Sequence, residues 1–147
     1  MKSIYSLAFF SIFSLSLSVS AQKGTTAHGD TILIETFPVW PGCEDNAEFS
    51  SPEKCFNAKL AEHIRTNLKY PPLAVENEVQ GRVNISFVIS YEGEVTDIKL
   101  LGDKKLGYGL ETEAVRVIKL LPAMKPATSN GQSVNMKYRV PIVFKLM

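Results

Sequence analysis

Two stretches in which apolar and polar side chains alternate strictly constrain this chain more than any other feature of its sequence. The shorter stretch carries apolar side chains at Val83, Ile85, Phe87, Ile89 and Tyr91. The longer stretch carries them at Val134, Met136, Tyr138, Val140, Ile142, Phe144 and Leu146. A period of two places one side of an extended chain on a core and the other near water. Both stretches are therefore predicted to be strands of an antiparallel sheet.

The first strand is predicted to continue into a hairpin. Glu92-Gly93 favours a tight turn, which returns Val95–Leu101 as a second strand beside the first. Thr96, Ile98 and Leu100 are expected to share one face of that strand, because every second side chain points the same way.

The final strand, Val134–Leu146, would be about 40 Å long, which is too long to be paired over its whole length. It also contains Pro141, which has no backbone N–H to donate to a neighbouring strand. These two features predict an edge position or a bulge.

Two further segments carry apolar residues at helical spacing, which predicts two amphipathic helices. The first contains Phe56, Leu60, Ile64 and Leu68, and the second contains Leu106, Leu110, Ala114, Ile118 and Leu121. The order helix, strand, strand, helix, strand predicts an α+β fold. We expect a two-layer sandwich in which two helices cover a three-stranded antiparallel sheet.

The first helix could begin in either of two ways. Ser50 with Glu53 fits a capping box, whereas Ser51 with Pro52 fits an N-cap followed by the first helical residue.

Residues 1–21 have the pattern of a secretory signal peptide. Lys2 precedes the uncharged run Ile4–Val19, and small residues at Val19 and Ala21 predict cleavage between Ala21 and Gln22. A retained membrane anchor is the alternative, although the run is shorter than the ~20 apolar residues of a span and contains several serines. We expect residues 22–36 to form a flexible leader and residues 37–147 to form one exported domain.

Cys43 and Cys55 are the two cysteines of the chain. Their spacing is not the Cys-x-x-Cys pattern of a thiol oxidoreductase, and too few histidines lie nearby for a structural zinc site. In an oxidising compartment the pair predicts a disulfide, and two free thiols are the alternative.

Charge and motifs exclude several classes of function. Without residues 1–21, Lys and Arg balance Asp and Glu, which argues against a protein that binds nucleic acid. We find no phosphate-binding loop, nucleophile elbow or cluster of metal ligands, so we expect no enzyme, metal or cofactor site. Trp40 is expected to pack over the edge of the core, with ligand stacking as the alternative.

The backbone of a sheet edge is the remaining candidate for binding. An exposed edge strand offers unpaired N–H and C=O groups that can accept an extended peptide or a second copy of the chain. An ordinary protected edge, covered by charges such as Lys137, Arg139 and Lys145, is the alternative.

Several short motifs in a fixed order resemble the C-terminal domain of TonB-type energy transducers. They are Tyr70-Pro71, Gln80–Val83, the hairpin Ile89–Val95, Glu113–Val115 and the closing Val140–Leu146. The segment from Pro38 through Cys43 to Phe56 is similar to the extended form found in Bacteroidetes relatives. The resemblance covers Phe37 to Leu146.

The resemblance implies a periplasmic domain that holds the N-terminal box peptide of a TonB-dependent outer-membrane receptor by strand addition to its last strand. The implied contact residues are Asn67, Leu68, Lys69 and Tyr70 before the Tyr-Pro pair, and Val134, Met136, Lys137, Tyr138, Arg139 and Val140 on the last strand. Pro141 removes one possible donor from that strand.

Two other functions remain open. If the leader is retained as an anchor, the chain would be a full energy transducer, with proton-driven motor proteins of the inner membrane as partners. The third hypothesis, from a different class, is a non-enzymatic envelope scaffold or inhibitor that uses Trp40–Cys43 as its contact surface.

Overall fold

A computed structural model describes residues 22–25, 31–44 and 48–147. In chain order the elements are β1 (Gln22–Thr25), β2 (Thr31–Ile34), α1 (Pro52–Asn67), α2 (Pro72–Glu76), β3 (Gly81–Ile89), β4 (Val95–Leu101), α3 (Leu110–Lys119), β5 (Ala127–Ser129), β6 (Gln132–Val134) and β7 (Met136–Phe144).

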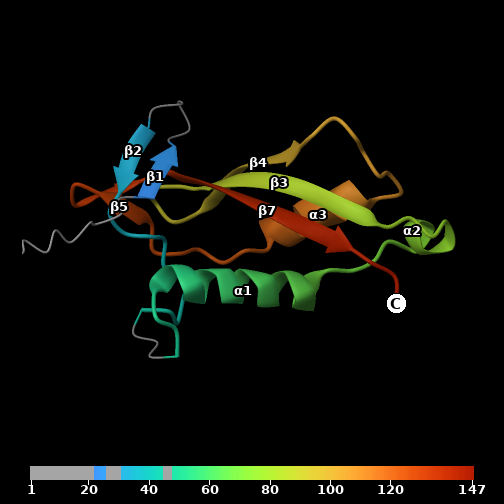
Figure 1. Cartoon of the computed structure of the whole chain (residues 1–147), viewed down its shortest axis with the longest axis horizontal. Coiled ribbons are helices and arrows are strands. Elements are labelled where there is room, and N and C mark those ends of the chain that lie inside the picture. The colour runs from blue at the N-terminus through green and yellow to red at the C-terminus, as the bar shows by residue number, and fades with distance from the viewer. Residues whose placement is uncertain (1–21, 26–30, 45–47) are drawn as a thin grey trace, which may run out of the picture.

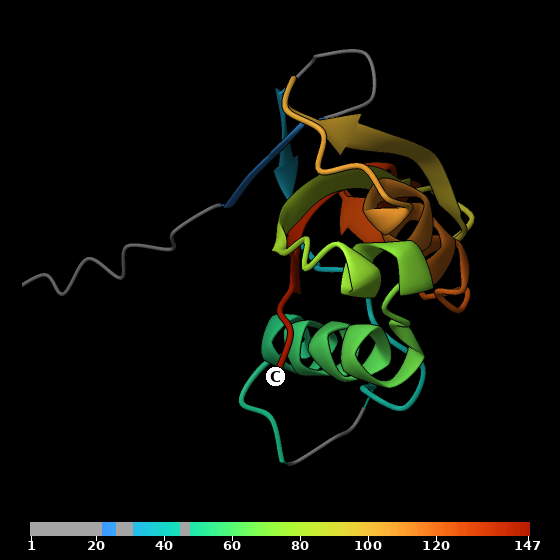
Figure 2. The same cartoon turned by 90° about the vertical axis from the view of Figure 1, so that its right-hand side faces the viewer.

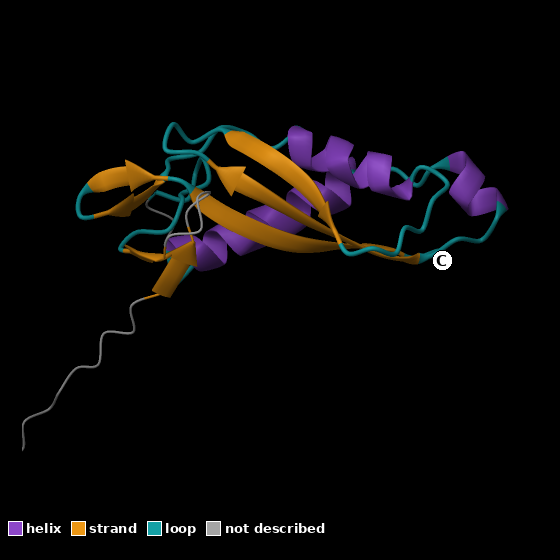
Figure 3. Ribbon diagram, turned by 90° about the horizontal axis from the view of Figure 1, so that it is seen from above, coloured by secondary structure: helices purple, strands orange, loops and turns teal. Residues whose placement is uncertain are grey.

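The central sheet is antiparallel and has the strand order β4-β3-β7. The helices α1 and α3 lie on the same side of it (Figures 1 and 2). This is the predicted α+β fold, with a three-stranded sheet and two covering helices. Two short hairpins, β1-β2 and β5-β6, lie at one end of the sheet, and α2 lies at the other (Figure 3).

The core lies between the sheet and the two helices. Strand β3 buries Val83, Ile85, Phe87 and Ile89 on this side, as its period-two pattern predicted. Helix α3 contributes Leu110, Ala114, Val117 and Ile118, and α1 contributes Cys55, Phe56 and Leu60. These apolar faces leave water together, which is the main favourable free energy of the fold.

Local hydrogen bonds differ at the starts of the two long helices. The side chain of Ser51 accepts a hydrogen bond from the backbone N of Lys54 at 3.3 Å, so Ser51 is the N-cap and Pro52 follows it. Helix α3 begins at Leu110, after the first residue of its predicted stripe, Leu106. The carboxylate of Glu111 instead accepts bonds from the backbone N–H groups of Leu106 and Gly107, just before the helix.

The predicted shared face of Thr96, Ile98 and Leu100 on β4 is wrong for Thr96. The register of β3 and β4 shifts between Ser86 and Val88, and Asp97 takes a left-handed φ of 50° at this bulge. Thr96 therefore pairs with Val88 on the outer face, whereas Leu100 pairs with core-facing Ile85. One extra residue in a strand exchanges the faces of all residues beyond it.

The predicted strand Val134–Leu146 is divided. Val134 belongs to β6, which pairs with β5 across a tight turn at Asn130-Gly131, where both residues have positive φ. Between β6 and β7, the side-chain Oδ1 of Asn135 accepts a hydrogen bond from the backbone N of Tyr91 at 2.8 Å. This contact, between residues far apart in the sequence, separates the strands.

The segment expected to be a flexible leader contains ordered pairing. Strands β1 and β2 form an antiparallel hairpin within it. The chain then runs antiparallel to residues 125–128, with mutual backbone hydrogen bonds between Val39 and Lys125 at 2.9 and 3.0 Å. Residues 1–21, the predicted signal peptide that ends at Ala21, lie outside the described residues, and Gln22 is the first residue of β1.

Candidate functional site

Strand β7 forms one edge of the central sheet. It pairs with β3 along its whole length, and no described strand is paired with its other side. Hairpin strand β1 lies close to part of β7 but pairs only with β2 (Figure 1). In the described part of the chain, the outer edge of β7 therefore keeps its main-chain groups unpaired.

Pro141 shows which backbone groups point outward. It lies opposite Asn84 in the β3–β7 register, although it has no N–H to donate. The hydrogen bonds at this point must therefore come from its neighbours, Val140 and Ile142. Because strand residues alternate in direction, the odd-numbered residues of β7 point their main-chain groups away from β3. Lys137, Arg139 and Val143 then offer both a donor and an acceptor outward, and Pro141 offers an acceptor only.

The inner side of this edge is apolar and half-buried at Met136, Tyr138 and Val140. The ring of Tyr138 lies 5.0 Å from that of Phe56, centroid to centroid, and its hydroxyl donates a hydrogen bond to Oδ1 of Asn57. Burial raises the pKa of Tyr138 above its ordinary value, and the negative charge of Glu53 adds to the increase. Helix α1 thus supports the first half of β7 from below.

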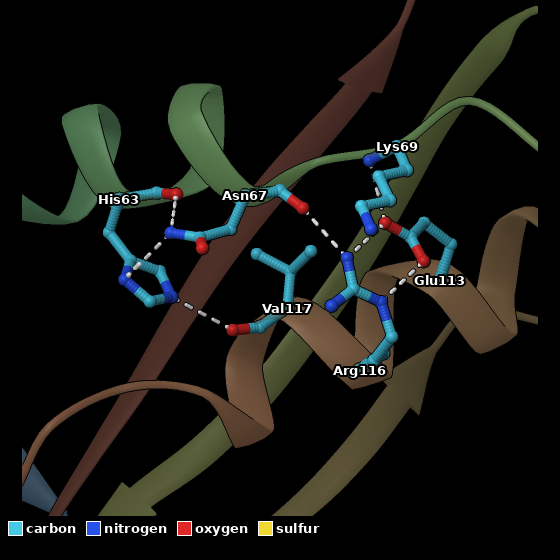
Figure 4. Close-up of polar contacts among 6 residues, drawn as sticks. All are labelled: His63, Asn67, Lys69, Glu113, Arg116 and Val117. Carbon is cyan, nitrogen blue, oxygen red and sulfur yellow. Dashed lines mark hydrogen bonds and ion pairs between the residues drawn. The ribbon is translucent and has the colours of Figure 1, made fainter.

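The segment 67–70 is held by an ion pair on α3 (Figure 4). The carboxylate of Glu113 accepts a hydrogen bond from the backbone N of Lys69 at 2.6 Å. The guanidinium of Arg116 donates to the backbone O of Asn67 at 2.7 Å and also to Glu113. Together the two side chains satisfy main-chain groups on both sides of Leu68, where α1 ends.

Tyr70 connects the same segment to the end of β7. Its hydroxyl donates to the backbone O of Val79 at 2.6 Å, and its ring packs 5.6 Å from that of Phe144. Tyr138, in contrast, lies against the first turns of α1. The structure therefore places the two predicted groups of contact residues toward opposite ends of β7, with Val134 outside that strand.

His63 and the remaining candidates Trp40, Cys43 and Cys55 make structural contacts. His63 accepts or donates at Nε2 to the backbone O of Val117, 3.0 Å away, and lies beside Trp40. Trp40 is buried, as predicted, with its ring 5.9 Å from that of Phe56. Cys43 and Cys55 form the predicted disulfide, with their Cα atoms 5.9 Å apart.

Three residues important for this site were missed in the sequence. Glu113 was quoted only within the Glu113–Val115 motif and Arg116 not at all, although their i, i+3 spacing is that of an ion pair. Phe37 has no periodic signal, yet its ring packs 5.4 Å from that of Phe56.

Neither a metal nor a membrane span is indicated by the described residues. No group of three or more His, Cys, Asp or Glu side chains in them could hold a metal ion. No helix among them is both long and apolar enough to cross a bilayer.

The Glu113–Arg116 pair predicts a pH dependence of stability. The hydrogen bond from Arg116 is the largest cause that holds the pKa of Glu113 below its ordinary value. A lowered folded-state pKa gives stability that is fully present above the unfolded value and is lost as pH falls through the folded value. We expect E113Q to cost about 1–3 kcal/mol near neutral pH and to lose less stability than the wild type between about pH 5 and pH 2, measured by urea unfolding.

The exposed pair Lys59–Glu62, also at i, i+3 and 3.4 Å apart, supplies the control. E62Q is expected to change stability by less than about 1 kcal/mol. Equal pH profiles for E113Q and the wild type would contradict the assignment.

This is a two-layer α+β domain whose last strand has one unpaired edge. It belongs to the class of small domains whose sheet is open to a further strand. The family described as Gram-negative bacterial TonB protein C-terminal matches residues 66–146, more than half of the chain. The chain belongs to this family. Segment 31–44 and most of α1 precede the matched residues.

Two solution structures of the TonB C-terminal domain of Helicobacter pylori are similar to this chain. One, of residues 194–285 of that protein, has 29% sequence identity and a TM-score of 0.44, and the match covers 61% of this chain and 92% of that one. The other, of residues 179–285, has 26% identity and a TM-score of 0.45, with coverage of 63% and 83%. No curated protein matches the chain.

Membership in the family carries general consequences. The family is non-enzymatic and related to transport, and its C-terminal domains are periplasmic. Membership suggests a TonB-like role in energy-coupled transport and interaction with outer-membrane receptors.

Proposed function

We propose that this chain binds the N-terminal box peptide of a TonB-dependent outer-membrane receptor by strand addition to the outer edge of β7. The observation that carries the proposal is the unpaired edge of Met136–Phe144 in the described part of the chain. An added strand gains affinity from main-chain hydrogen bonds to such an edge. Lys137, Arg139 and Val143 supply the outward donors.

The positions of the residues in the fold determine which of them a peptide on β7 would contact. Met136, Lys137, Tyr138, Arg139 and Val140 lie on β7, whereas Val134 belongs to the β5-β6 hairpin. Asn67, Leu68, Lys69 and Tyr70 would meet the peptide only toward the Phe144 end, where Tyr70 packs. A peptide that contacts both groups must therefore extend along most of β7.

The consequence of receptor binding depends on whether the leader is cleaved or retained. A mature periplasmic chain that begins at Gln22 would bind receptors as a module without its own anchor. A retained leader would allow contact with motor proteins of the inner membrane and transmission of force. The scaffold hypothesis has less support, since the side chains of Trp40 and Cys43 are buried.

Arg139→Pro tests strand addition. The substitution removes an outward N–H without removing a β3–β7 hydrogen bond, and Pro141 shows that β7 accommodates proline at an outward position. The loss of one main-chain bond of about 1 kcal/mol should weaken a receptor box peptide about fivefold. Amide chemical shifts during a peptide titration give both the affinity and the binding site.

Arg139→Ala is the matched control, because it removes the side chain and keeps the N–H. We expect Arg139→Pro to bind more weakly than this control, and peptide-induced shifts to follow residues 136–144. If the peptide leaves the β7 amides unchanged, or if both variants bind equally well, strand addition at this edge is wrong. A second copy of the chain at the same edge would appear instead as concentration-dependent dimerisation.

A further inference from the structure

The outer face of the sheet carries unpaired positive charge beside the free edge. Lys137 and Arg139 are exposed at neighbouring outward positions of β7, and Arg82 is exposed on β3. Lys145 follows directly after β7 and is exposed too. None of these four side chains forms an ion pair with another residue of the described ranges.

Among the described residues that lie in register on this face, none is acidic. The residues in register on it are Arg82, Asn84, Ser86 and Val88 of β3, Thr96, Lys99 and Leu101 of β4, and Lys137, Arg139, Pro141 and Val143 of β7. Asp97, in the neighbouring bulge, is already paired with Lys99 at 2.9 Å. The positive charge next to the edge is therefore available to a partner.

The inner face beside the edge has the opposite character. Met136, Tyr138 and Val140 are apolar and only half-buried, with α1 below them. A strand added to β7 would direct alternate side chains to the two faces. Its inward side chains would cover these apolar residues, and its outward side chains would lie beside Lys137 and Arg139.

We propose that the β7 edge selects a strand in which acidic side chains at positions i and i+2 face Lys137 and Arg139, with apolar side chains between and around them. The inference rests on the proposed function, and it adds the chemistry of the preferred peptide. The spacing of two holds for a parallel and for an antiparallel guest, because every second residue of either shares a face.

A set of related peptides tests this preference. The reference is a receptor box peptide with Glu at i and i+2. The second peptide has Gln at both positions, and the third has Lys. Two opposite-charge cross-strand pairs should make the Glu peptide bind wild type about fivefold more tightly than the Gln peptide at low salt. The difference should shrink at high salt because the sites are exposed.

Charge reversal on the protein locates the effect. K137E/R139E keeps the main-chain edge and should reverse the preference, so that the Lys peptide binds more tightly than the Glu peptide. K104E/K105E changes the net charge equally, in the exposed turn that follows β4, which is separated from β7 by β3, and should keep the wild-type preference. Circular dichroism confirms that the variants are folded.

The outcomes separate this inference from the proposed function. Shifts along β7 with equal affinities for the Glu and Gln peptides would overturn the acidic preference and leave strand addition intact. Equal effects of K104E/K105E and K137E/R139E would also overturn it, since net charge alone would then explain the result. If none of the peptides perturbs β7, strand addition itself fails.

Discussion

Phe56→Ala is expected to lower the free energy of unfolding by about 3–5 kcal/mol. The side chain is fully buried, and its ring packs against those of Phe37, Trp40 and Tyr138 at centroid distances of 5.4, 5.9 and 5.0 Å. Alanine would leave a cavity between segment 31–44, α1 and β7. The three elements cannot close around it without breaking their own contacts.

Urea unfolding followed by fluorescence measures this loss. Trp40 is the single tryptophan of the chain and lies against Phe56, so its emission reports on this cluster directly. Tyr91→Ala is the control, because that aromatic side chain is 57% exposed and should change stability by no more than about 0.5 kcal/mol. A Phe56→Ala variant within about 1 kcal/mol of wild type would show that the cluster is not part of the cooperative core.

Removal of the disulfide should cost about 3 kcal/mol. The bond joins residues 12 positions apart in the sequence, and both cysteines are almost fully buried. Without it the unfolded chain gains conformational freedom, and the segment before α1 is no longer tied to that helix. Urea unfolding of C43S/C55S is the measurement.

Reductant provides the control for this experiment. It should lower the stability of wild type toward that of C43S/C55S and leave the variant unchanged. Two results would each mean that the disulfide does not contribute to the stability of the fold. One is equal stability of the oxidised wild type and the variant. The other is a wild type whose stability does not change although the reductant is shown to break the disulfide.

Both expected effects concern residues that precede the matched segment 66–146. The rings of Phe37 and Phe56 pack on that of Tyr138, and the ring of Trp40 packs on that of Phe56. The inner side of the candidate binding edge is therefore built partly by residues outside the family match. In this chain segment 31–44 belongs to the domain, and it helps to support β7.

The candidate site was predictable only in part. The Tyr-Pro motif and the final alternating stretch indicated segment 67–70 and β7. The contact between the Glu113–Arg116 pair and segment 67–70 was not predicted, because Glu113 is separated from Lys69 by 44 positions and meets it only after folding. Sequence patterns describe which residues share a face of one element, and they contain little information about contacts between elements.

The sequence by itself determined the elements and their class. Local alternation specified the strands around Phe87 and Tyr138, and Ser51-Pro52 specified a helix start, because neighbouring residues alone decide these patterns. For the last strand the sequence left an edge position and a bulge as alternatives, and the tertiary structure decided that β7 lies at an edge. The tertiary structure alone decided that Asn135 separates β7 from β6 and that the bulge at Asp97 exchanges the faces of β4. These outcomes depend on hydrogen bonds and burial between distant segments, whose free energies are set only when the whole sheet and its helices assemble.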